Sequence, residues 1–165
     1  ASCESTLIID TMEELLDAGF DPSYGITFSN DCISAKNSGR CFTTFDMGII
    51  DLYSGELTQY KQGAAPTYII HEGDTEVLRG ASLPIGILES AACDVIHQEL
   101  QPEDRVVMVS DGALGDEDEM QEIISTLKTD DCKETLDRIV SQVLFRCKGK
   151  LEDDVTVIVA KLEIA

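Results

Sequence analysis

Two short apolar runs, each with acidic residues at one end, constrain the fold of this chain most strongly. The first, Val106–Val109, ends at Ser110-Asp111-Gly112, and the second, Val155–Val159, follows Glu152-Asp153-Asp154. A short apolar run bounded by turn residues is typical of a strand that is buried on both faces. We therefore expect both runs to belong to strands inside a sheet, the last of which extends over Val155–Leu162.

The acids at the ends of these runs are the main candidates for a chemical site. If the two strands pair antiparallel, Asp111 and the Asp153-Asp154 pair emerge at the same edge of the sheet. Clustered carboxylates raise one another's pKa unless a cation neutralises them, and oxygen ligands suit Mg²⁺ or Mn²⁺ rather than zinc. Gly112 would let the chain turn sharply away from Asp111. Spacing alone slightly favours a second interpretation, in which 110–112 is an ordinary turn and 152–154 a solvated loop.

The remaining segments predict helices near both ends of the chain, with strands between them. The segment 22–36 is ambiguous, because Pro22 could open a helix with Ile26, Ile33 and Ala35 on a buried face while several residues within it weaken the case. The other expected elements are a helix over 4–18, a hairpin over 41–52 and 57–62, strands over 67–71, 75–78 and 94–100, and helices near 116–127 and 132–147.

The length of the chain suits a single globular domain that covers residues 1–165, and its charge makes that domain strongly acidic. Twelve Lys and Arg against 32 Asp and Glu give a net charge of −20, which repels nucleic acid and anionic lipid and favours basic partners or cations. No apolar run approaches the roughly 18 to 20 residues of a membrane span, and residues 1–4 do not resemble a signal peptide. We therefore expect a cytoplasmic domain without nucleic-acid or direct membrane contact.

Other residues that often carry chemistry point to structural roles. The six cysteines form no Cys-x-x-Cys pair and are expected to be reduced thiols. His71 and His97 belong to no metal or triad motif. The acids of 115–119 lack the spacing of a calcium loop, and they suit the first turn of a helix instead.

Four segments in consistent order resemble those of PPM-type phosphatases, the metal-dependent serine/threonine phosphatases also called protein phosphatase 2C-like. Two of them are the runs that carry the acids, Val106–Leu114 and Glu152–Val159. The other two match the bacterial branch typified by the stage II sporulation protein E and by the phosphatases that regulate stress sigma factors. They are Met47–Gly55 running to Gly63–Ile69, and Leu83-Pro84-Ile85-Gly86-Ile87.

The resemblance implies an α/β (α+β) sandwich of two antiparallel sheets flanked by helices, with two Mn²⁺ or Mg²⁺ ions at the sheet edge. By position, Asp111 and Asp153 would be metal ligands, and Asp154 would orient water or support the ligands. In the family, a water that bridges the ions attacks the phosphorus of a phosphoserine protein directly. The implied substrate, by family analogy, is an anti-anti-sigma factor.

The chain departs from the family pattern at its beginning. That pattern opens with an acidic strand motif and an Asp-Gly-Met-Gly-type turn, just before the helix that matches Glu4–Ala18, and Asp31 and Asp46 do not fit these motifs. We therefore expect the C-terminal portion of a phosphatase domain, in which a half-site binds metal weakly and is inactive on its own. The alternative is a non-catalytic interaction module with a degenerate phosphatase fold. The parent protein could be longer and membrane-anchored, with this segment as its cytosolic domain.

Overall fold

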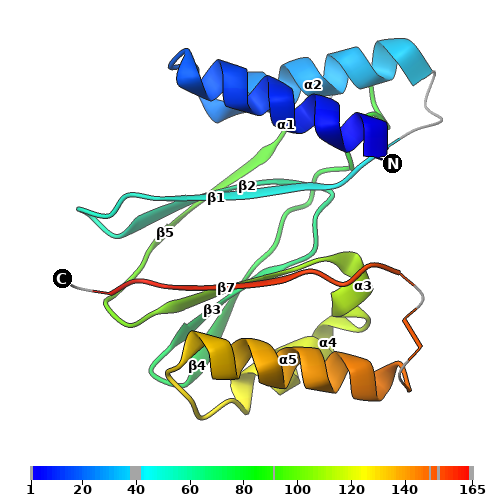
Figure 1. Cartoon of the computed structure of the whole chain (residues 1–165). Helices are drawn as coiled ribbons and strands as arrows, with labels where there is room; N and C mark the ends of the chain where they lie inside the picture. Colours follow the sequence, from blue (N-terminus) through cyan, green and yellow to red (C-terminus); the bar gives the residue numbers. More distant parts are fainter. Residues whose placement is uncertain (1, 38–41, 91, 149, 152, 164–165) are drawn as a thin grey trace. The chain divides into compact units, whose positions relative to one another are not determined.

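The computed structural model of the chain describes residues 2–37, 42–90, 92–148, 150–151 and 153–163 (Figure 1). Its elements follow the predicted order of helices, strands, helices and a final strand. They are α1 (Ser2–Asp17), α2 (Pro22–Asn37), β1 (Phe45–Ile50), β2 (Glu56–Gln62), β3 (Thr67–His71), β4 (Asp74–Leu78), β5 (Asp94–Glu99), β6 (Arg105–Val109), α3 (Asp111–Leu114), α4 (Glu117–Ser125), α5 (Cys132–Arg146) and β7 (Val157–Lys161).

The chain forms two compact units, each assembled from separate stretches of sequence. Unit 1 comprises Ala1–Ile49, Thr58–Ala64 and Gly80–His97, and unit 2 comprises Ile50–Leu57, Ala65–Arg79 and Gln98–Ala165. Because these stretches alternate along the chain, no single boundary divides the sequence into the two units.

Unit 2 is built on a four-stranded antiparallel sheet in the order β4-β3-β6-β7. Val107 is fully buried at its centre, opposite Tyr68 on β3 and Val159 on β7. α5 contacts β7, and α4 contacts β3 and β4 (Figure 1). Helix side chains such as Met120 and Ile139 thus complete an apolar core with the strands. The predicted burial of the 106–109 strand is confirmed, with Met108 only partly covered.

Both long helices of unit 2 begin at an aspartate cap. Asp116 accepts the Glu119 N–H at 3.0 Å, and Asp131 accepts the Glu134 N–H at 2.7 Å. Such a side chain satisfies one of the backbone donors that a helix N-terminus leaves unpaired, and acids in the first turn suit its dipole. The acids around 116–119 therefore serve a helix start, as the sequence indicated.

In unit 1, the segment 22–36, which was ambiguous in sequence, is helical throughout and belongs to α2. This helix packs beside α1 (Figure 1). Ile26 and Ile33 are buried as predicted, whereas the prediction for Ala35 is wrong because that residue is exposed. Asn30 fixes the same face through polar contacts, since its side chain accepts the Gly86 N–H at 2.9 Å and donates to the Leu88 carbonyl at 3.0 Å.

The sheet associated with unit 1 has three strands in the order β1-β2-β5. The connection between β1 and β2 is short, which allows only antiparallel pairing, and it is closed by a hydrogen bond from the Asp51 N–H to the Glu56 carbonyl. The side chain of Thr58 on β2 contacts that of His97 on β5. The Cys93 thiol, just before β5, donates to the carbonyl of Lys61 on β2. From the first contact to the second, the residue number rises from 58 to 61 along β2 and falls from 97 to 93 along the β5 segment. β2 and β5 are therefore also antiparallel. The expected two antiparallel sheets with helices are confirmed.

A buried ion pair lies inside unit 1. The Lys61 ammonium is fully buried and lies 2.7 Å from the Asp46 carboxylate. Burial lowers the pKa of Lys61, and the Asp46 carboxylate opposes that change. Asp46, which matches no family metal motif, therefore has a structural partner.

Most element boundaries differ from those expected by up to four residues, and the strand expected over 41–52 spans Phe45–Ile50. The short helix α3 was not predicted, the helix over 132–147 ends at Arg146, and the last strand begins at Val157 instead of 155. The four cysteines whose side chains are described are free thiols, as expected, and Cys3 and Cys41 lie outside that set. Within the described residues, no helix has the length and apolar character that crossing a membrane requires.

Candidate metal centre

The antiparallel pairing of β6 with β7 brings the two predicted acids to one edge of the sheet of unit 2. Val109 lies opposite Val157, so Asp111, just after β6, and Asp153, just before β7, leave the sheet at the same end. Both carboxylates are exposed, and both line one open cavity of about 530 Å³. The other residues that line it are Gly112, Gly115, Arg146, Cys147, Lys148 and Lys150.

Ser110 and Gly112 hold the two acidic segments against each other. The Ser110 N–H donates to the Thr156 carbonyl, and the Thr156 N–H donates to the Ser110 hydroxyl, each at 2.9 Å. That hydroxyl also donates to the Asp154 carbonyl at 3.3 Å. A Cβ at Gly112 would collide with the same Asp154 carbonyl oxygen. The close approach therefore requires glycine after Asp111.

Each of the two carboxylates uses one oxygen to order its own loop. Oδ1 of Asp111 accepts the Gly112 N–H at 3.0 Å, and Oδ1 of Asp153 accepts the Asp154 N–H at 2.8 Å. Neither Oδ2 atom makes a hydrogen bond within the described residues. The side chains are thus oriented by their own backbone while one oxygen of each is available to a ligand.

This donor set fits part of a hard divalent cation site. Carboxylate oxygens are what Mg²⁺ and Mn²⁺ prefer, but such ions take about six ligands. In the described part of the chain, no group of three or more His, Cys, Asp or Glu residues is placed to hold a metal. Asp111 and Asp153 therefore present two carboxylates to one cavity, with Asp154 next to them and held to Ser110 through its backbone.

Three cations also line this cavity, a feature that no sequence pattern predicts. The Arg146 guanidinium donates to the Ala113 carbonyl at 2.7 Å and to the Leu114 carbonyl at 2.9 Å, at the end of α3. Lys148 and Lys150 follow on the segment that leaves α5. In sequence the group looks like an ordinary positively charged helix end, so its position beside the two acids required the fold.

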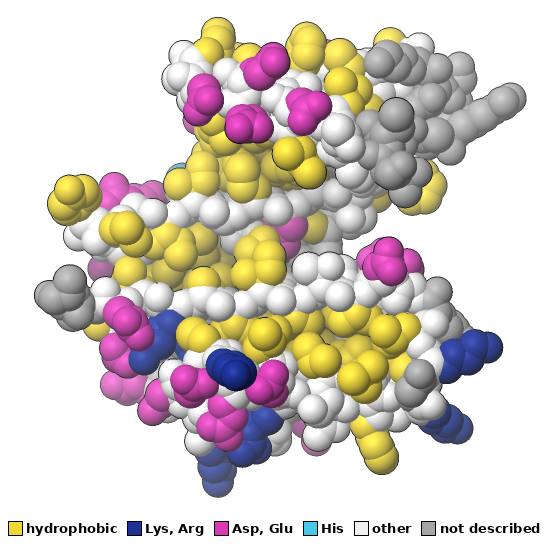
Figure 2. All heavy atoms as spheres, viewed as in Figure 1, with side chains coloured by type: hydrophobic (Ala, Val, Ile, Leu, Met, Phe, Trp, Pro, Cys, Tyr) yellow, Lys and Arg dark blue, Asp and Glu magenta, His cyan; other side chains and the backbone are white. Residues whose placement is uncertain are grey.

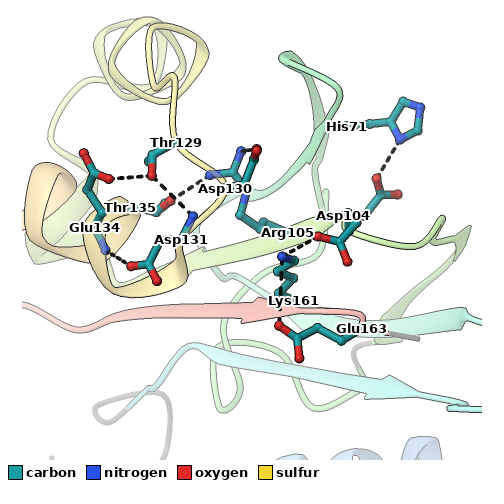
Figure 3. Close-up of polar contacts among 11 residues, drawn as sticks. His71, Asp104, Arg105, Thr129, Asp130, Asp131, Glu134, Thr135, Lys161 and Glu163 are labelled. Atoms are coloured by element: carbon teal, nitrogen blue, oxygen red, sulfur yellow. Dashed lines mark hydrogen bonds and ion pairs between the residues drawn. The ribbon is translucent and has the colours of Figure 1, made fainter. Parts of the chain in front are cut away.

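A second cluster of polar residues lies at the opposite end of β6 (Figure 3). His71 Nδ1 lies 2.6 Å from Asp104 Oδ1, and this hydrogen bond raises the pKa of His71. Arg105 is buried and donates to the Thr135 hydroxyl at 2.8 Å, which ties the start of β6 to α5. Each of these groups has a partner in the fold, which agrees with the structural interpretation of His71.

Known proteins are similar to this chain over nearly its whole length. The profile of the family described as stage II sporulation protein E (SpoIIE) matches residues 1–163. The chain is 30% identical to stage II sporulation protein E of Priestia megaterium and 28% identical to that of Bacillus subtilis strain 168. Each match covers 99% of the chain, but only 29% and 21% of those proteins. The chain therefore spans less than a third of the length of these relatives.

Solved structures show the same fold. The PP2C phosphatase domain with a fragment of the regulatory domain of SpoIIE from Bacillus subtilis matches at a TM-score of 0.84 and 29% identity, over 96% of this chain and 49% of that one. The catalytic domain of the serine/threonine protein phosphatase PstP, in complex with two manganese ions, matches at a TM-score of 0.74 and 16% identity. That match covers 99% of this chain and 82% of PstP's.

The profile match, the identities and the structural similarity agree on one family, and its fold relatives include a phosphatase that binds manganese. This chain belongs to the stage II sporulation protein E family and has the fold of a PP2C-type serine/threonine phosphatase domain.

Proposed function

We propose that this chain is the C-terminal portion of a metal-dependent phosphoprotein phosphatase domain, in which Asp111 and Asp153 are ligands of the divalent ions. The observation that carries the proposal is the convergence of these two carboxylates in one open cavity at the end of β6 and the start of β7. A SpoIIE phosphatase-domain structure prepared by presoaking with Mn supports manganese or magnesium as the ion.

The chain's own residues prepare this site before any ion binds. Ser110 and Gly112 hold the two acidic loops together, and the backbone N–H after each aspartate orients its carboxylate. Asp154 is exposed next to Asp153, and we propose that it orients water. Bound divalent ions would lower the pKa of water and neutralise charge that develops on phosphoryl oxygens.

The substrate we propose is a phosphoserine protein, by analogy with the family an anti-anti-sigma factor. We also propose that residues 1–165 alone hydrolyse it slowly or not at all. Two carboxylates supply a minority of the ligands of one hard ion, and a site with so few ligands binds its metal weakly. The curated relatives are several times longer, so an active domain would draw further ligands from outside these residues.

The first experiment measures Mn²⁺ binding and phosphoserine hydrolysis by the 165-residue chain. We expect weak binding that falls further in Asp111→Asn, with negligible turnover of a phosphoserine peptide in either protein. Asp118→Asn is the matched control, because it removes one exposed carboxylate from the start of α4, outside the cavity. It should bind Mn²⁺ as the wild type does.

Two results would contradict this proposal. Equal Mn²⁺ affinity in the wild type and Asp111→Asn would remove Asp111 from the metal site. Robust Mn²⁺-dependent turnover by the chain alone would disprove its inactivity. Binding of a partner protein that is unaffected by Asp111→Asn and by Mn²⁺ would instead favour the non-catalytic interaction module.

A further inference from the structure

Three cations help to line the Asp111–Asp153 cavity. Arg146, Lys148 and Lys150 lie within five residues, in a chain that has only twelve Lys and Arg and a net charge of −20. Figure 2 shows cationic side chains beyond the C-terminal end of α5. We call Arg146, Lys148 and Lys150 the basic arm. Its charge is opposite to that of most of the protein surface, so it favours anions where the rest of the chain repels them.

The members of the basic arm differ in whether their charges are used within the fold. Arg146 donates to the two carbonyls at the end of α3 and also lies 3.6 Å from the Glu119 carboxylate. Lys148 and Lys150 are exposed, and within the described residues neither forms an ion pair, including with Asp111 or Asp153. Other described cations, such as Lys61 and Lys161, do pair with carboxylates. The two lysines are thus available to a ligand in the cavity.

The backbone at Lys148 is held in a conformation that glycine usually adopts. Its φ is +51°, the left-handed region, where side chains other than glycine cost about 1 to 2 kcal/mol. The Lys148 N–H donates to the Phe145 carbonyl and the Lys150 N–H to the Cys147 carbonyl, so this turn caps α5. Strained positions that retain a functional side chain are concentrated at binding and catalytic sites.

We infer that Lys148 and Lys150 position the phosphate group of the phosphorylated substrate beside Asp111 and Asp153. An ammonium group with three donors suits a phosphate, and cations are needed next to carboxylates that would otherwise repel it. This inference rests on the proposed function for its substrate, but the basic arm can be tested without metal. Lys148 and Lys150 are positioning residues, and the acids remain the metal ligands.

The test is a metal-free NMR titration of the chain with O-phosphoserine peptide. We expect amide shifts confined to the basic arm and its neighbours, and an apparent Kd about fivefold higher in Lys148→Gln/Lys150→Gln, as for the loss of two exposed ion pairs. Lys128→Gln/Lys133→Gln is the control, because it makes the same charge change at two exposed lysines outside this cavity. It should leave the Kd unchanged.

A second variant separates charge from folding. Lys148→Gly removes the ammonium while it relieves the left-handed strain, so it should fold at least as well as the wild type and still bind the peptide more weakly. Unchanged affinity in the lysine variants would overturn the inference. Equal affinity for a peptide with glutamate in place of phosphoserine would overturn the assignment to phosphate. Because this titration contains no metal, a finding that the wild type and Asp111→Asn bind Mn²⁺ equally well would refute the proposed metal site without changing the outcome for the two lysines.

Discussion

Single residues determine the geometry at both ends of β6. At one end, Gly112 permits the contact with the Asp154 carbonyl, and the Ser110 hydroxyl bridges the same two segments. At the other end, His71 contacts Asp104, whose side chain is 5% exposed while that of His71 is 49% exposed. The contacts of Ser110 and Gly112 order the candidate site, whereas the His71–Asp104 contact joins the end of β3 to the turn before β6. Substitutions at the two ends of β6 should therefore have different consequences.

The His71–Asp104 contact predicts a pH dependence of stability. The hydrogen bond to Asp104 raises the pKa of His71 above its ordinary value of 6.5 in the folded protein. Its stabilising contribution is therefore complete below that value and is lost as pH rises through the folded-state pKa. The difference in unfolding free energy between the wild type and His71→Gln should shrink across that rise. An NMR titration that gives His71 a pKa of 6.5 or lower would contradict this account.

Helix α5 is the element that connects the core of unit 2 to the candidate site. Ile139 and Val143 are fully buried against the sheet, and Arg146 at its last turn donates to the carbonyls that end α3, the helix that begins with Asp111. Gly115, just after α3, lies so close to the Arg146 guanidinium that a Cβ there would collide with it. The position of Asp111 thus depends on α5.

Two arginines of α5 allow this dependence to be measured. Arg146→Gln should lower the unfolding free energy by about 1 to 3 kcal/mol, because two backbone carbonyls lose a charged donor. Arg138→Gln is the control, since Arg138 makes an exposed ion pair with Glu134 on the same helix. It should cost at most about 0.5 kcal/mol. Chemical denaturation of the two variants gives the comparison, and equal losses would refute the role of Arg146.

The sequence predicted elements where local pattern and burial agree. The strand over 106–109 is apolar throughout, and the structure buries it. Helix α2 was ambiguous because Gly25 and Asn30 oppose helix formation locally, whereas in the fold Asn30 bonds to Gly86 and Leu88, far along the chain. α3 was missed because four residues carry no periodicity.

The candidate site could be predicted only in part for a similar reason. Asp111 and Asp153 each follow or precede a recognisable strand, so antiparallel pairing sufficed to bring them together. The basic arm follows a helix, and its position beside these acids depends on how α5 contacts α3 and β7, which no local pattern encodes. The left-handed backbone conformation of Lys148 could not be predicted either, because the glycine next to it in the sequence is the residue type expected to adopt it.

At the scale of the whole molecule, the chain has the fold of its family but only a fraction of the length of two curated relatives. The SpoIIE profile matches residues 1–163, yet the chain covers 29% and 21% of its curated relatives. Its net charge of −20 favours cations and opposes anionic ligands everywhere except near clustered lysines. We therefore regard the Asp111–Asp153 cavity as the point where a divalent ion and a phosphate group would meet.

The most direct test of this account is a double-mutant cycle for Mn²⁺ binding by calorimetry, with Asp111→Asn, Asp153→Asn and the double variant. If both carboxylates hold one ion, each single variant should lose most of the affinity, and the double variant should lose little more, because the two effects are coupled. Losses that add independently, or a variant that binds as the wild type does, would contradict the assignment of Asp111 and Asp153 to a common metal site.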